Sequence, residues 1–324
     1  MRPGLKFICV LICLASCSPG DLVDLPTSPA RITVLSLNEV GRPWSILISP
    51  STSTGRHYYP GGIPDAIVKI YEDGNFVEHL TYVPIPWDEL QELPDSRPAQ
   101  YVSTTNGPKE GHEYSITVDA DGYTSVSSTY RQPDAVPADI KFELVETNEK
   151  VFTSNFSDGT RNWTEYDTAT VWSFDITITF VDPPGKNYYD FWMQKSPTED
   201  SLDYYLGDFL LPDSGTPTGD FLLNAMLDDY EFSEKQRTMK FKAQVDDHYI
   251  VGYQPKPRVP NWFRISLRSI SEDVYKFLVM SRKVQISNND PYAQPVTTTS
   301  NIQNGLGVFG AYTPTSKTFY YKLK

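Results

Sequence analysis

Residues 172–180 read Trp-Ser-Phe-Asp-Ile-Thr-Ile-Thr-Phe, and this stretch decides the fold class. Every second residue is large and apolar, and the residues between them are polar. A period of two predicts a β-strand with one buried face and one solvated face. The predicted buried set is Trp172, Phe174, Ile176, Ile178 and Phe180. We expect a central core strand here, ended by the turn-forming Asp-Pro-Pro-Gly at 182–185.

The same alternation recurs along most of the chain, and turn residues separate the runs. Asp73-Gly74 and Asp121-Gly122 each follow a β-prone run, which predicts tight turns between strands. Further strands are expected near 32–36, 44–48, 141–145, 188–194, 239–245, 263–267 and 319–323. The predicted fold class is mainly β, with two β-sandwich-like domains.

One helix is expected in the second domain, from Ser271 to about Lys283. Ser271 is a suitable N-cap, acidic residues follow it, and Arg282 and Lys283 suit the C-terminal end. The helix has an apolar stripe at the spacing i, i+3, i+4, i+7, which would lie on a sheet. The stripe consists of Val274, Phe277, Leu278 and Ser281.

The first sixteen residues have the form of a signal peptide. A short basic start precedes an apolar run far shorter than the roughly 20 residues that span a bilayer. The run ends in Leu14-Ala15-Ser16-Cys17, the form of a lipobox, so we expect cleavage before Cys17 and lipid attachment to its thiol. All three cysteines lie at or before position 17, so the mature chain would form no intrachain disulfide.

These features divide the chain into four predicted parts. They are a signal peptide at 1–16, a lipidated tether at 17–30, an N-terminal β-sandwich domain at 31–135 and a C-terminal one at 138–324. Pro133 and Pro137 bracket the expected linker.

The net charge argues against one class of partner. It is −13 for the whole chain, and removing the signal peptide takes away two more basic side chains. Such a surface repels phosphate backbones, so we expect no nucleic-acid partner.

Several segments, in order along the mature chain, resemble a Bacteroidota outer-membrane lipoprotein family known as domain of unknown function 4249. They are 43–48, 68–74, 111–118, 180–189, 290–296 and 300–310. The resemblance implies a lipid-anchored outer-membrane protein, often encoded beside a TonB-dependent transporter, and a first domain similar to the transthyretin or carboxypeptidase-regulatory sandwich. The family has no established catalytic residues to carry over. Ala293 and Gln294 stand where we expect an acidic residue, which weakens any idea of a metal site in that block.

The residues themselves offer few signs of chemistry. The four histidines are scattered singly, and no nucleophile elbow or phosphate loop occurs, so we expect no enzyme, no metal and no cofactor. Aromatic side chains in turn-rich stretches are the candidate binding set, although tyrosine in a β-protein also serves simply as core. The set is Tyr58, Tyr59, Tyr204 and Tyr205. Thr168 and Ser201 lie in Asp-Thr-Ala and Asp-Ser-Leu and are candidates for O-glycosylation.

The favoured function is therefore an accessory binding component that works with a TonB-dependent nutrient transporter. The alternatives are a structural or adhesive envelope lipoprotein, and a glycan or peptide hydrolase. Whether the protein faces the cell surface or the periplasm stays open at this point.

Overall fold

The computed structural model describes residues 29–51, 61–84, 99–104, 107–157, 162–200, 202, 208–209, 226–229, 234–246, 261–288 and 299–323. This part of the chain is mainly β, with three sheets and one long helix, which confirms the predicted fold class.

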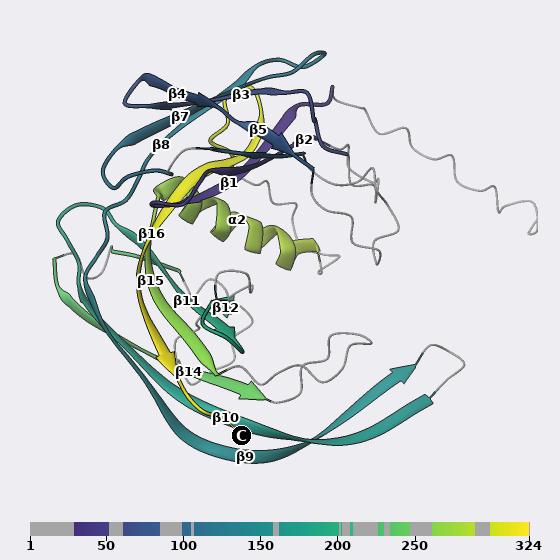
Figure 1. Cartoon of the computed structure of the whole chain (residues 1–324), viewed down its shortest axis with the longest axis vertical. Coiled ribbons are helices and arrows are strands. Elements are labelled where there is room, and N and C mark those ends of the chain that lie inside the picture. Colours follow the sequence, from purple (N-terminus) through teal and green to yellow (C-terminus); the bar gives the residue numbers. More distant parts are fainter. Residues whose placement is uncertain are drawn as a thin grey trace, which may run out of the picture.

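One sheet of nine strands extends through both halves of the molecule (Figure 1). Its order is β12-β11-β15-β16-β1-β2-β6-β5, and β13 pairs with β11 beside that path. Its strands are β1 (Ile32–Glu39), β2 (Ser45–Pro50), β5 (Thr81–Val83), β6 (Ala99–Val102), β11 (Tyr188–Ser196), β12 (Asp208–Phe209), β13 (Met226–Asp228), β15 (Trp262–Ile270) and β16 (Leu306–Tyr320).

Two smaller sheets complete the β-structure. The order in the first is β4-β3-β7-β8, and the order in the second is β14-β10-β9. Their strands are β3 (Ile67–Glu72), β4 (Asn75–His79), β7 (Glu113–Asp119), β8 (Val126–Arg131), β9 (Ala138–Ser157), β10 (Asn162–Val181) and β14 (Gln236–Asp246). The predicted turns are present: Asp73 and Gly74 both have positive φ between β3 and β4, and Gly122 does so between β7 and β8.

Strand β16 joins the two halves by changing its partner. Leu306 to Tyr312 run parallel to β1, and Tyr312 to Tyr320 run antiparallel to β15. Tyr312 stands at the change, since it is in register with both Glu39 and Ile270. The strand expected at 319–323 therefore begins much earlier than its local pattern indicated.

The hydrophobic side chains form two main cores, one in each half. Tyr130 belongs to the first core and Val136 to the second, so the predicted boundary near residue 135 lies between them. The first core also contains Ile302, Phe309 and Ala311 from the C-terminal end of the chain. The division into domains 31–135 and 138–324 stays a prediction, because this C-terminal segment contributes to the first core.

Both smaller sheets cover the same face of the nine-stranded sheet. Phe309 packs in the first core and Phe319 against the second, and an even number of positions separates them along β16. Side chains at even spacing point to one face of a strand. Two sandwich-like units thus share one sheet, and its other face is left for the helix.

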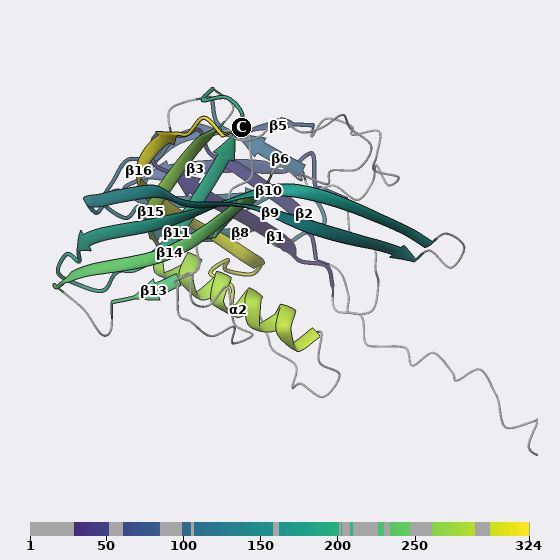
Figure 2. The same ribbon diagram turned by 90° about the horizontal axis from the view of Figure 1, so that it is seen from below.

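The central strand prediction is confirmed in β10. Trp172, Phe174, Ile176, Ile178 and Phe180 are all buried, and they pack with side chains of β9, β14, β11 and β15. Ile176 is in register with Phe142 on one side and Phe241 on the other. Beyond residue 171 toward its N-terminal end, β10 pairs with β9 alone among the described strands, and Figures 1 and 2 show this two-stranded ribbon projecting from the molecule.

The linker between the halves lies along β16 and is bound to it. Thr313 Oγ1 donates a hydrogen bond of 2.6 Å to the Pro133 carbonyl, and Thr315 Oγ1 donates one of 2.8 Å to the Val136 carbonyl. Gln132 Nε2 donates to the Tyr312 carbonyl at 2.9 Å. The first two bonds satisfy carbonyls of the linker, which lies outside the strands, and all three fix one half against the other.

Helix α2 (Glu272–Asn288) covers part of the other face of the shared sheet, as predicted. Val274 is buried against Ile270 and Val308, with Phe277 and Leu278 packed beside it. Figure 1 shows the helix in the hollow of the curved sheet.

The ends of α2 differ from the expectation. The Ser271 carbonyl accepts the first helical hydrogen bond from Tyr275, but its side chain Oγ accepts the N–H of Ala311 and so holds β16. The helix continues to Asn288, and Arg282 and Lys283 are therefore not in its last turn. No glycine or proline follows Lys283 before Pro291, so nothing in the sequence stops the helix at the predicted residue.

Candidate functional site

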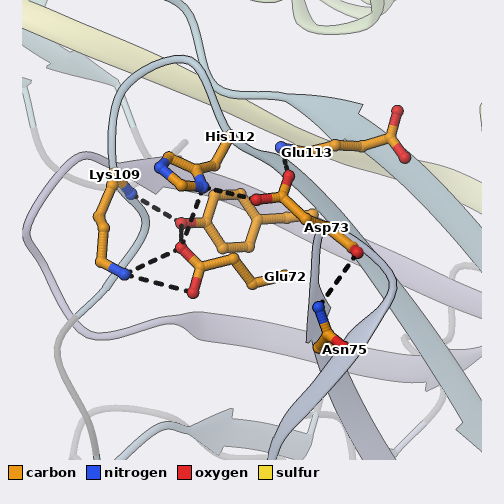
Figure 3. Close-up of polar contacts among 7 residues, drawn as sticks. Glu72, Asp73, Asn75, Lys109, His112 and Glu113 are labelled. Atoms are coloured by element: carbon orange, nitrogen blue, oxygen red, sulfur yellow. Dashed lines mark hydrogen bonds and ion pairs between the residues drawn. The ribbon is translucent and has the colours of Figure 1, made fainter.

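Three polar sites of the described residues were candidates for function, and the first is a cluster at the turn between β3 and β4 (Figure 3). His112 Nδ1 lies 2.7 Å from Asp73 Oδ2 and 3.4 Å from Glu72 Oε1. Tyr114 donates from its hydroxyl to Glu72 Oε1 at 2.8 Å, and Lys109 Nζ donates to the same oxygen at 3.0 Å. The cluster joins the β3–β4 turn to the start of β7.

The electrostatics of this cluster favour a structural role. Burial alone would raise the pKa of Glu72, but the hydrogen bonds from Tyr114 and Lys109 outweigh it and lower the pKa. The backbone N–H of Glu113, followed by His112, lowers the pKa of Asp73. Both carboxylates are therefore stabilised as hydrogen-bond acceptors. Neither is prepared to take up a proton, as a general base must.

The second site is a cleft of about 580 Å³ between the two halves. The linker, the end of β8, the Pro-Gly turn after β10 and the start of α2 all contribute to its lining. Lys186 Nζ donates to Glu272 Oε1 at 3.1 Å and lies 5.1 Å from the ring centre of Tyr188. A hydrogen bond from Tyr188, followed by those from Lys276 and Lys186, lowers the pKa of Glu272 to about 2. Asp134 and Arg131 add further charge on the linker side.

The third site is a groove of about 470 Å³ on the face of the shared sheet that carries α2. Register places its floor in successive rows across β11, β15 and β16, beginning beside the helix. The rows are Arg268 and Pro314, then Trp192, Ser266 and Ser316, then Gln194 and Arg264, and Asp190 is in register beside Arg268. Arg42 and Pro43 line it from the β1–β2 turn, and Ser45 lines it from the start of β2.

A buried ion pair lies at the end of the groove nearest the helix. Arg268 donates from Nε to Asp190 Oδ1 at 2.5 Å and from Nη2 to Oδ2 at 2.7 Å. The Asp190 side chain is 1% exposed and that of Arg268 is 13% exposed. Burial raises the pKa of Asp190, while the charge of Asp190 raises the pKa of Arg268 against the effect of burial. This two-point geometry fixes the plane of the guanidinium.

Two aromatic rings hold the same guanidinium. Its carbon lies 4.3 Å from the ring centre of Trp192 and 4.8 Å from that of Tyr312. Tyr312 in turn donates from its hydroxyl to Glu39 Oε2 at 3.0 Å, and Arg42 Nε lies 3.8 Å from Glu39 Oε1. A continuous polar network therefore crosses the junction of the two halves.

A family model described as "Domain of unknown function (DUF4249)" matches residues 22–318. The chain belongs to the DUF4249 family. No curated protein matches the sequence significantly.

Two sequence blocks that carried the DUF4249 resemblance have structural roles. In the block 180–189, buried Asp182 accepts a hydrogen bond from the Tyr189 hydroxyl and another from the Glu234 N–H at 3.1 Å. In the block 300–310, Asn301 exchanges two hydrogen bonds with the backbone of Phe309. Gly307 has a φ of +103°, and a Cβ there would lie 1.9 Å from the Val34 carbonyl oxygen. The glycine permits the close approach of β16 to β1.

Most residues that the sequence singled out for function lie outside the described residues of this DUF4249 chain. They are Cys17, Tyr58, Tyr59, Tyr204, Tyr205 and Ser201. Thr168 lies within β10, where its Cα partner in β9 is Val151. Among the described residues, no group of three or more His, Cys, Asp or Glu could hold a metal ion. The same part of the chain contains no helix that is both long and apolar enough to cross a membrane.

Neither the groove nor the cleft is predicted from the sequence. Asp190 and Arg268 are 78 positions apart, and only the pairing of β11 with β15 brings them together. One local signal was available. Asp190 alternates with Tyr188 and Trp192, and Arg268 alternates with Ser266 and Ile270, so each charge shares a strand face with large apolar side chains. An acid and a base inside two neighbouring strands favour an ion pair on one sheet face.

Proposed function

We propose that this DUF4249 protein is a Bacteroidota outer-membrane lipoprotein, anchored through a lipid on Cys17. In this proposal it is an accessory binding component that works with a TonB-dependent nutrient transporter and has no catalytic activity of its own. The lipobox after a basic and apolar start supports the anchor. The partnership with a TonB-dependent transporter is supported by the resemblance to the DUF4249 family alone.

The observation that carries the binding role is the cleft of about 580 Å³ between the two halves. Ligand sites of this size occur preferentially at domain junctions, because two units supply convergent groups there. The lining offers charged and hydrogen-bonding groups from the linker, including Arg131 and Asp134, and from the α2 side, including Lys186 and Glu272. Such a mixture suits capture of a polar nutrient.

Anchoring makes weak contact with the transporter sufficient. A tether of about a dozen residues confines the protein near its partner and supplies a high local concentration. The acidic overall charge then affects the rate of association more than its strength.

Purification of the lipidated protein from outer membranes that are cross-linked before solubilisation in detergent tests the proposal, because cross-linking retains weak contacts. We expect a TonB-dependent transporter to co-purify in comparable amount, and we expect deletion of the gene to impair growth on that transporter's substrate. Recovery of the protein alone, or with adhesin or secretion components, would contradict the proposal and favour a structural or adhesive envelope protein.

A pair of substitutions tests the cleft separately. Lys186→Ala combined with Glu272→Ala removes two charged groups of the lining, and both side chains are exposed enough for the fold to persist. We expect this variant to co-purify with the transporter but to reduce growth on the substrate. Lys240→Ala removes a similar exposed charge from β14, outside the cleft, and should change neither result.

A further inference from the structure

The groove beside α2 differs in charge from the rest of the protein. The whole chain carries a net charge of −13, yet the groove lining contains three arginines and one acid. They are Arg42, Arg264, Arg268 and Glu39. Even when the buried Asp190 is counted, the groove remains positive. A cationic patch on an acidic protein attracts an anionic partner and orients it during encounter.

The buried ion pair at this position is weak evidence of a stabilising role. Taking two charges out of water costs about as much as their attraction returns, so well-packed apolar residues would serve stability equally well. What the arrangement provides is a fixed guanidinium plane, held by Asp190 beneath and by the rings of Trp192 and Tyr312. Asp190 takes two of the five N–H donors of this guanidinium, so what Arg268 adds to the groove is a positive charge fixed in place beside Arg264 and Arg42.

Apolar side chains flank the cationic centre on the same sheet face. Leu35 and Leu37 are 39% and 40% exposed on β1, and both share the facing of Glu39 by strand alternation. At the far end, Tyr320 is exposed and its ring centre lies 5.0 Å from that of Trp262. The face thus presents apolar groups, then arginines, then aromatic groups.

We propose that this groove binds an acidic segment of a partner polypeptide. Carboxylates of the segment meet the arginines, and its apolar side chains pack on Leu37 and on the Trp262–Tyr320 pair. A polypeptide fits better than an acidic sugar polymer, because only the polypeptide supplies apolar side chains at intervals along an anionic chain. Exposed aromatic side chains near arginines are also typical of protein interfaces.

This inference goes beyond the proposed function, because it assigns a second surface and the chemistry of its occupant. It does not depend on the identity of the partner or on the cleft. Loss of transporter co-purification would leave it standing, and loss of peptide binding would leave the nutrient cleft standing.

Fluorescence anisotropy with defined peptides tests the groove. The protein is the full mature chain carrying Cys17→Ser, and the probe is a fluorescein-labelled peptide of alternating Glu and Leu. Matched peptides replace every Glu by Lys or by Gln. We expect binding of the Glu–Leu peptide, weakening with added salt, and no binding of the other two.

Substitutions locate the site. Arg42→Gln combined with Arg264→Gln should weaken binding of the Glu–Leu peptide by about tenfold or more, since each lost contact is a charge-assisted hydrogen bond. Lys240→Gln removes a positive charge from β14, outside the groove, and should leave affinity unchanged. Asp190→Leu combined with Arg268→Met replaces the ion pair by apolar side chains, and it should weaken binding while thermal unfolding remains cooperative.

Three results would overturn the inference. They are absence of binding by the Glu–Leu peptide, equal binding by the Lys–Leu peptide, and equal affinity in the Arg42 and Arg264 double variant. Binding of oligogalacturonate in place of the peptide would show that the occupant is an acidic sugar, and so would also overturn the assignment to a polypeptide.

Discussion

The hydroxyl of Tyr312 donates a hydrogen bond of 3.0 Å to Glu39, although 273 positions separate the two residues. Tyr312 is also the residue at which β16 leaves β1 and joins β15, and its ring faces the guanidinium of Arg268. One side chain therefore connects the first strand, the last strand and the ion pair of the groove. The two halves are held together at this point.

Replacing Tyr312 by Phe tests that connection. The ring and its contact with Arg268 remain, and only the hydrogen bond to partly buried Glu39 is lost. We expect the free energy of unfolding in urea to fall by about 0.5–1.5 kcal/mol. An unchanged unfolding midpoint would show that the bond contributes nothing to holding the halves together.

Gly307 offers a sharper test of the pairing between β16 and β1. Gly307→Ala places a Cβ against the Val34 carbonyl in addition to straining a positive φ, whereas Gly122→Ala meets no atom within 4 Å and carries the strain alone. We expect a cost of about 1–2 kcal/mol for the Gly122 variant, from strain, and a clearly larger cost for the Gly307 variant. Equal losses of stability in chemical denaturation would contradict the close approach of the two strands.

The alternation of β10 predicts that alanine substitutions at two neighbouring residues have very different effects on the free energy of unfolding. Ile176 is 1% exposed between Phe142 and Phe241, and Thr177 is directed to the opposite face. Ile176→Ala should lower the free energy of unfolding by about 2–5 kcal/mol because it leaves a cavity, while Thr177→Ala should cost well under ~1 kcal/mol. Similar losses in the two variants would refute the facing of this strand.

The lowered pKa of Glu272 predicts that the stability of the fold depends on pH. Its pKa is lowered from 4.5 to about 2 by hydrogen bonds from Tyr188, Lys276 and Lys186, so the ionised form stabilises the fold above about pH 4.5. This contribution is lost as the pH falls from 4.5 toward 2. The side chain is 46% exposed, which limits the effect to about 1 kcal/mol or less.

Urea unfolding of the wild type and of Glu272→Gln between pH 7 and pH 3 measures this effect. The wild type should be the more stable protein from pH 7 to about pH 5, and the difference should shrink at lower pH. A difference that stays constant down to pH 3 would mean that the ionised Glu272 is not the cause.

The features that could be predicted from sequence are those encoded within one or two neighbouring elements. Alternation located the buried face of β10, Asp-Gly pairs located two turns, and the apolar stripe located α2. These patterns reflect local geometry, in which side chains two, three or four positions apart share a face.

The features that were missed depend on contacts between distant strands. Nothing in residues 306–312 indicates that they lie beside β1, because alternation reports that a face is buried but not which strand is its neighbour. Asp190 and Arg268 likewise read as isolated charges until β11 and β15 are paired. The tyrosines predicted for binding lie outside the described residues, so the groove and the cleft are the candidate sites whose geometry is described.

The proposal that the protein works at the outer membrane depends first on its lipid anchor, and the mass of the N-terminal peptide tests that anchor most directly. The protein is isolated from outer-membrane fractions, digested, and its N-terminal peptide is measured by mass spectrometry. We predict a peptide that begins at Cys17 and carries the added mass of a diacylglyceryl group, and we predict that Cys17→Ser abolishes both the processing and the membrane association. A mature N-terminus at another residue, or an unmodified Cys17 in a protein that fractionates with soluble components, would contradict the account.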